Sequence, residues 1–251
     1  GNLSSMLSRP VSTCLLLGMC YFAYYLWSTR RPPEELARDY AFSYDAVVVQ
    51  GEYWRAVTAS FAHFDLLHLG FNMMSLYNLA ALEDLYGSVA YAVITANLVL
   101  LTMATCALMY HVLIHRFGRH EMGPQRAVGF SCVLFAWMVV ASLRMETFCP
   151  LPFLPSMCFR TLRIPLLDLP VNAGALVLLV LTKFIMPRSS LIGHLAGIVW
   201  GYPLAWGLLE PLRPPLACAA ALAGALAARR LWFFLLAPPT VDGSGAGEAA
   251  P

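Results

Sequence analysis

Long apolar segments separated by polar stretches run along most of this 251-residue chain. A helix that crosses a lipid bilayer needs about 20 mostly apolar residues. Segments of roughly this kind recur, and each predicts a helix: Val11–Trp27, Leu66–Leu82, Val89–Leu113, Val128–Leu143, Val171–Met186 and Ser190–Leu209. The pattern is typical of an all-α, polytopic membrane protein. We therefore expect a transmembrane core over residues 11–210, after an N-terminal segment of residues 1–10.

The part of the chain after this core is harder to interpret. Leu216–Leu236 is a candidate for a weak seventh helix, but Arg229 and Arg230 interrupt it. Its second half could lie at the membrane interface, so residues 211–236 are left open between a spanning and an interfacial helix. The tail, residues 237–251, is rich in Pro, Gly, Ala and Ser, which predicts disorder.

The composition agrees with a membrane protein. Hydrophobic residues make up 59% of the chain and charged residues only 12%, against about 25% charged residues in soluble domains. The net charge is +2 and no long basic run occurs, so we expect no nucleic-acid partner. The seven cysteines include no CxxC pair, which argues against a zinc ribbon and against a disulfide framework. Cys149 and Cys158 share one loop and are the remaining candidates for a pair.

One ionisable residue stands inside the last apolar segment of the core. An ionisable side chain within a membrane helix is costly, which makes His194 a candidate functional residue. Gly193, Gly197 and Gly201 surround it at intervals of four. Residues four apart lie on one helix face, and small residues there allow a second helix to approach closely. We therefore expect another helix to pack beside His194.

Three further polar residues complete a chemical set with this histidine. His68 and Asn72 are four apart, hence on one helix face, and both can donate hydrogen bonds from neutral side chains to a developing oxyanion. Ser131 follows Gly129 at the start of the fourth apolar segment, where the unpaired amides of a helix N-terminus could assist. A serine hydroxyl needs a base in reach, and His194 is the candidate.

Each of these residues has a structural alternative. A serine or an Asn–His pair in a membrane helix often joins helices by hydrogen bonds, and a lone histidine can belong to a proton path. It is the combination of nucleophile, base and two donors that favours catalysis over these readings.

The other titratable residues favour less specific roles. His111 and His115 are four apart, and His120 and Glu121 follow, but the HExxH pattern of metalloproteases is absent. We expect no metal site. Paired aspartates within the apolar segments are also absent, which argues against an aspartyl protease. Two further residues, His63 near the second apolar segment and Glu83 at its far end, are interpreted as interfacial and as a cap or interface anchor.

Four sequence motifs follow one another along the chain, and the first of them is a Trp-Arg pair in the first loop. They are Trp54-Arg55, His68-xxx-Asn72, Gly129-x-Ser131 and Gly193-His194-xx-Gly197-xxx-Gly201. This combination resembles the rhomboid intramembrane serine proteases across nearly the whole core. The resemblance implies a bundle of six transmembrane helices in a lipid bilayer. It also implies a serine-type endopeptidase that cleaves transmembrane protein substrates without a cofactor.

The resemblance further implies a role for each candidate residue. Ser131 and His194 would form a catalytic dyad with no third, acidic member. His68, Asn72 and the Ser131 backbone would form the oxyanion hole.

Outside the dyad, the resemblance assigns supporting roles. Trp54 and Arg55 would belong to a membrane-embedded loop and be structural. Phe135, one turn after the serine, would place an aromatic ring against the histidine. The sequence around the serine looks most like the eukaryotic rhomboid-domain-containing subgroup, which is associated with endomembranes such as the endoplasmic reticulum and Golgi.

One residue departs from the family pattern. The position after the serine is usually glycine, and here it is Cys132, whose side chain could crowd the serine. The departure keeps open a non-catalytic rhomboid relative that binds or escorts membrane proteins. A transporter that uses His68 and His194 as proton relays is a second alternative, although inverted repeats are not evident. The substrate, the orientation in the membrane and the oligomeric state stay open.

Overall fold

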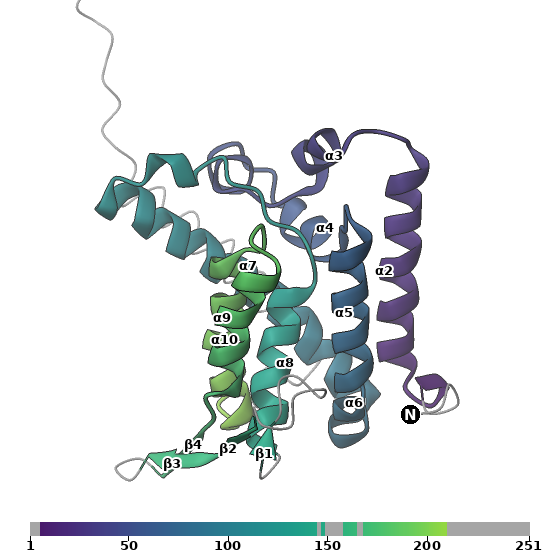
Figure 1. Cartoon of the computed structure of the whole chain (residues 1–251), viewed down its shortest axis with the longest axis vertical. Helices are drawn as coiled ribbons and strands as arrows, with labels where there is room; N and C mark the ends of the chain where they lie inside the picture. The colour runs from purple at the N-terminus through teal and green to yellow at the C-terminus, as the bar shows by residue number, and fades with distance from the viewer. Residues whose placement is uncertain (1–5, 145–146, 149–157, 165–167, 210–251) are drawn as a thin grey trace, which may run out of the picture.

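The computed structural model describes residues 6–144, 147–148, 158–164 and 168–209 (Figure 1). Within these ranges the chain is mostly helical. The helices are α2 (Pro10–Ser28), α3 (Pro33–Tyr40), α4 (Arg55–Phe61), α5 (Leu66–Leu79), α6 (Ala81–Tyr86), α7 (Ser88–Phe117), α8 (Ser131–Arg144), α9 (Gly174–Ile185) and α10 (Leu191–Ala205), with the short turns η1 (Asp45–Val49) and η2 (His120–Met122).

Each of the six apolar segments forms a helix, as the hydrophobic pattern predicts. In the described part of the chain, α2 and α7 are the two helices long and apolar enough to cross a membrane, while α8, α9 and α10 are shorter apolar helices. The second segment stops earlier than expected, because α5 ends at Leu79 and the chain continues as α6. The candidate seventh helix and the tail lie outside the described residues.

The expectation of a purely α-helical chain is wrong for the segment between α8 and α9. Among the described residues of this segment, four short strands form two antiparallel pairs. They are β1 (Thr147–Phe148) with β2 (Phe159–Arg160), and β3 (Leu162–Ile164) with β4 (Leu169–Val171). Prolines punctuate this segment, and proline disrupts a helix interior because it lacks an amide hydrogen and clashes with the preceding turn.

Helix α8 forms the centre of the fold. Its side chains include the fully buried Val133, Trp137 and Val140, and α5 and α10 both pack against it. Figure 1 shows α3 and α4 at the end of the bundle where α8 begins, and the strands at the end where it finishes.

The glycines of α10 account for its close contact with α8. The backbone carbonyl of Cys132 lies so close to Gly197 that an added Cβ would overlap it, and a Cβ on Gly201 would stand 2.7 Å from the Val139 Cβ. The close approach of another helix is therefore confirmed, with α8 as that helix. A Cβ on Gly193 would meet only Ser190 of its own helix, so Gly193 is not part of this contact.

The first loop is held by a buried arginine. Arg55, 8% exposed, donates to the backbone carbonyl of Arg38 in α3 and pairs with Glu52. These bonds tie α4 to α3, which supports a structural role for Arg55. Its neighbour Trp54 is 56% exposed and does not belong to the protein core.

Candidate active site

Ser131 and His194 meet where α8 and α10 are in contact. The Nε2 atom of His194 lies 2.8 Å from the hydroxyl oxygen of Ser131, a hydrogen-bond distance. Ser131 is the first residue of α8, and His194 lies in the first turn of α10. His194 is 3% exposed, whereas Ser131 is half-buried. The two residues that sequence analysis selected as nucleophile and base are thus paired.

An aromatic ring fixes the plane of this imidazole. Phe135 stacks on His194 with ring centroids 4.4 Å apart and an interplanar angle of 20°. Phe135 lies one turn after Ser131 on α8, so one helix supplies both the hydroxyl and the ring. Across the described residues, no carboxylate is hydrogen-bonded to His194.

A glycine brings His68 to the start of α8. Gly129 has a φ of +106°, a conformation that side chains rarely adopt. A Cβ at this position would stand 2.5 Å from the Cε1 and Nε2 atoms of His68. The His68 ring therefore lies against the backbone two residues before Ser131, which is possible only because residue 129 has no side chain.

Asn72 lies one turn after His68 on α5 and is 3% exposed. Its amide nitrogen donates to the backbone carbonyl of His68 at 2.9 Å. Asp65 caps this helix by accepting from the His68 amide at 2.7 Å. Both candidate oxyanion donors are therefore held on the first two turns of a capped helix.

Cys132 is buried near Thr102 and Cys106 of α7, and its backbone carbonyl faces Gly197. The crowding expected from this departure does not separate the dyad, because Ser131 and His194 stay 2.8 Å apart. Cys132 and the dyad line a small cavity of about 20 Å³, about the size of one water molecule.

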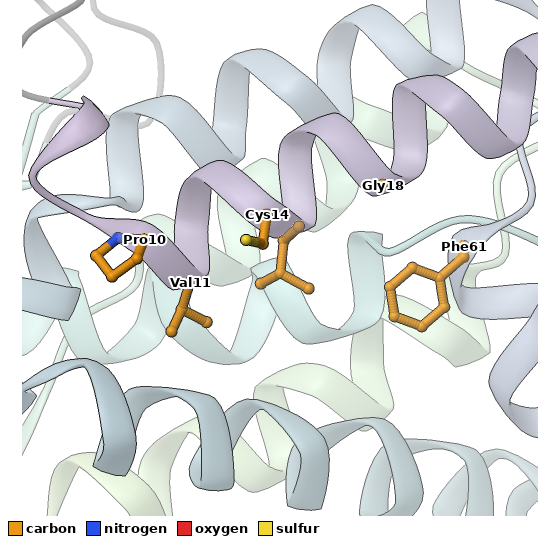
Figure 2. Close-up of a pocket in the computed structure, with 6 residues that line it drawn as sticks. Pro10, Val11, Cys14, Gly18 and Phe61 are labelled. Atoms are coloured by element: carbon orange, nitrogen blue, oxygen red, sulfur yellow. The ribbon is translucent and has the colours of Figure 1, made fainter.

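A larger hollow of about 320 Å³ lies along α2 (Figure 2). Its lining is apolar and consists of Pro10, Val11, Cys14, Leu15 and Gly18 from α2 and Phe61 from α4. It shares no lining residue with the cavity at the dyad. The hollow therefore offers no acid, base or oxyanion donor to the reaction.

The two histidines near the C-terminal end of α7, His111 and His115, contact a tyrosine side chain. The Tyr44 hydroxyl lies 2.7 Å from His111 Nδ1 and 3.3 Å from His115 Nε2, which joins η1 to α7. Within the described ranges, no group of three or more His, Cys, Asp or Glu side chains could hold a metal ion.

His63, interpreted as merely interfacial, is fully buried within the protein, with its ring 5.0 Å from that of His68. It lies in the link before α5, where no helical period indicates burial. Cys158 is disulfide-bonded, which agrees with its candidacy for a single pair, and its loop neighbour Cys149 lies outside the described residues.

Glu83 is a helix cap, as the sequence predicts, but it caps α2 and not the helix in which it lies. Its carboxylate is 2% exposed and accepts from the backbone amides of Val11 and Ser12 in α2 at 3.0 and 2.8 Å. The Ser88 hydroxyl donates to it at 2.7 Å. Glu83 therefore connects α6 to the first turn of α2.

Comparison with known proteins identifies the family of the chain. The family model of the rhomboid domain matches residues 50–211, which include both members of the dyad. The chain belongs to the rhomboid family. The rhomboid resemblance in the sequence is thereby confirmed, and with it the membrane-embedded character of the fold.

Several rhomboid relatives are similar over part of their length. Rhomboid-like protein 15 of Arabidopsis thaliana is 29% identical over 67% of this chain and 40% of its own length. Rhomboid-related protein 4 of Mus musculus is 30% identical over 65% of this chain and 48% of its own length. Rhomboid-type serine protease 2 of Neurospora crassa is 28% identical over 64% and 53%. The chain thus spans about half the length of the curated relatives it matches.

Proposed function

We propose that this protein is an intramembrane serine endopeptidase with Ser131 and His194 as its catalytic dyad. The observation that carries the proposal is the 2.8 Å contact between His194 Nε2 and the Ser131 hydroxyl. Similarity to rhomboid-type serine protease 2 of Neurospora crassa supports the same class of reaction.

The reaction proceeds in two steps. The Ser131 hydroxyl attacks the carbonyl carbon of the substrate while His194 Nε2 takes its proton, and the same proton then passes to the leaving amine. A water molecule, deprotonated by His194, next attacks the acyl-enzyme; the bond to the Ser131 oxygen breaks, that oxygen regains a proton from His194, and the second product leaves as a carboxylic acid. His68, Asn72 and the first amides of α8 hold the negative charge on the oxygen in both steps.

The substrate class is a transmembrane segment of another membrane protein. A helix hides its peptide carbonyls in internal hydrogen bonds, and these are strong in the absence of water. The segment must therefore unwind before Ser131 can reach a carbonyl. Substrates with Gly, Pro or polar residues near one end of the span unwind at lower cost and are expected to be cleaved first.

In this proposal α2, α5, α7, α8, α9 and α10 each cross the bilayer. The membrane is an endomembrane of the endoplasmic reticulum or Golgi, on the resemblance to the eukaryotic subgroup. Fluorescence microscopy of a tagged full chain, compared with markers of both organelles, tests the location. Cysteine-accessibility labelling in the loops tests the number of crossings.

A serine-directed fluorophosphonate tests the dyad in detergent micelles. The unmodified protein is expected to become labelled, and Ser131→Ala and His194→Ala to lose the label. Ser142→Ala is the matched control, because Ser142 is a second serine of α8, fully buried, whose hydroxyl donates to the Val139 carbonyl. This control is expected to label like the unmodified protein.

The same experiment decides between the protease and its main alternative. If the folded protein stays unlabelled while a rhomboid protease of known activity is labelled beside it, the endopeptidase proposal fails. A binding or escort role for membrane proteins then becomes the better account. Cleavage of a transmembrane reporter in liposomes completes the test, because labelling reports the activated serine and not the substrate.

A further inference from the structure

A fully buried histidine lies beside the two side chains proposed to hold the oxyanion. His63 is 0% exposed and stands in the link between α4 and α5. Its ring centroid is 5.0 Å from that of His68, and its imidazole lies near the Asn72 side chain. The two proposed reaction steps leave His63 without a role.

The contacts of His63 determine which ring nitrogen carries the proton. Nδ1 lies 3.1 Å from the backbone carbonyl oxygen of Phe61, and a carbonyl only accepts, so Nδ1 must donate. Burial and the neighbouring His68 lower the pKa of His63 to about 4. The ring is therefore neutral near pH 7, and its Nε2 is a hydrogen-bond acceptor.

The orientation of the Asn72 amide follows from a similar argument. Its nitrogen donates to the His68 carbonyl at 2.9 Å. In the flipped orientation the amide oxygen would face that carbonyl, and two acceptors would be in contact. The amide oxygen therefore points elsewhere, and both Asn72 Oδ1 and His63 Nε2 are buried acceptors without a hydrogen-bond partner.

We propose that His63 is a positioning residue that orients the Asn72 amide through one bridging water molecule. Water can donate two hydrogen bonds, so a single molecule satisfies both acceptors, and buried waters commonly serve such groups. With its oxygen held in this way, Asn72 keeps its second amide hydrogen available for the oxyanion. The inference rests on the proposed endopeptidase function and deepens the role of Asn72 in it.

A matched pair of substitutions separates the two nitrogens of His63. The amide nitrogen of His63→Gln stands near the position of Nε2, and that of His63→Asn near the position of Nδ1. His63→Gln is expected to keep most of kcat, because it can donate directly to the Asn72 oxygen. His63→Asn keeps the bond to Phe61 but is expected to lower kcat about tenfold or more, with KM unchanged.

Equal losses of kcat in the two variants, in step with equal losses of thermal stability, would show a merely structural role and overturn the proposal. The effect must also depend on Asn72. In an Asn72→Ala background, His63→Asn is expected to lower kcat no further, because the group that it positions is absent. A full additional loss would place the action of His63 elsewhere and also overturn the proposal.

The protonation state gives a readout that needs no activity. Nitrogen-15 NMR of the histidine-labelled protein near pH 7 is expected to show His63 as the neutral tautomer protonated on Nδ1. A proton on Nε2, alone or in addition, would remove the need for water and contradict the proposal. If the protein is not labelled and cleaves no substrate, but His63 has the expected tautomer, the endopeptidase proposal fails while the proposal of a water bridge between His63 and Asn72 still stands.

Discussion

The backbone carbonyl of Cys132 lies directly against Gly197, with no room for a Cβ between them. This contact joins the first turn of α8 to the second turn of α10. Ser131 precedes Cys132, and His194 lies one turn before Gly197, so the contact sets the distance between the two reactive atoms. The 2.8 Å bond of the dyad therefore depends on a residue that takes no part in the chemistry.

Gly197→Ala is expected to separate the two helices and reduce fluorophosphonate labelling strongly. The added methyl group would meet the Cys132 backbone, which cannot rotate away as a side chain can. Overpacking of this kind typically costs about 1–3 kcal/mol in unfolding free energy. Thermal denaturation and the rate of labelling, measured on the same detergent-purified sample, check both effects.

Gly70→Ala is the matched control for this substitution. Gly70 lies in helix α5, and an added Cβ would meet nothing within 4 Å. Replacing an open helical glycine by alanine is expected to raise stability by about 0.5–1 kcal/mol, with labelling unchanged. Similar behaviour of the two alanine variants would contradict the importance of the contact between α8 and α10.

Gly129→Ala is expected to displace His68 while leaving the dyad in place. The φ of +106° strains any side chain at this position, and the new Cβ would stand 2.5 Å from the His68 ring. Loss of one oxyanion donor typically lowers kcat by about 10²–10³. The expected result is a low kcat for a transmembrane reporter, and a kcat close to that of the unmodified protein would exclude His68 as a donor.

Phe135→Leu tests the ring that stacks on His194. Leucine fills most of the same volume but lacks the aromatic face, which lies 4.4 Å from the imidazole centroid. Aromatic pairs contribute about 0.5–1.5 kcal/mol beyond simple burial, so kcat is expected to fall by up to about tenfold. Phe135→Tyr, which retains the face, serves as the control, and equal activity of the two variants would argue against the stacking role.

Much of the fold could be predicted because the hydrophobic pattern is strong. Each of the six apolar segments contains a helix, and the spacing of Gly197 and Gly201 predicts a close helix contact on the face that the structure shows. The pairing of Ser131 with His194 was expected from chemistry, since a serine needs a base. Helical periodicity and chemical complementarity therefore carried these predictions.

The remaining features depend on contacts between distant segments, which no local pattern encodes. His63 lies outside any helix, and its full burial beside His68 follows from the tertiary packing of the link between α4 and α5. Glu83 caps a helix that begins more than seventy residues earlier. The position of Cys132 beside Thr102 and Cys106 of α7 likewise follows only from the packing of the helices.

Glu83→Gln tests the capping of α2 from α6. Burial by itself raises the pKa of Glu83, but bonds from the Ser88 hydroxyl and the Ser12 and Val11 amides outweigh it and leave the pKa below its ordinary value. The charged form is thus favoured in the folded state. At pH 7, Glu83→Gln is expected to reduce the unfolding free energy by about 1–3 kcal/mol, because a neutral amide offers only one accepting oxygen.

The pH dependence distinguishes this charged cap from simple packing. A depressed pKa stabilises the fold above the pKa of the unfolded chain, about 4.3 for Glu. That contribution disappears as the pH falls through the lower, folded-state value. The difference in melting temperature between the unmodified protein and Glu83→Gln is therefore expected to be largest at neutral pH and to shrink below about pH 4.

Asp84→Asn is the control, because Asp84 is the exposed neighbouring carboxylate paired with Arg9. It is expected to lower the melting temperature less than Glu83→Gln does at pH 7. If the difference in melting temperature between the unmodified protein and Glu83→Gln stays constant across this pH range, the substitution acts through side-chain shape and not through charge.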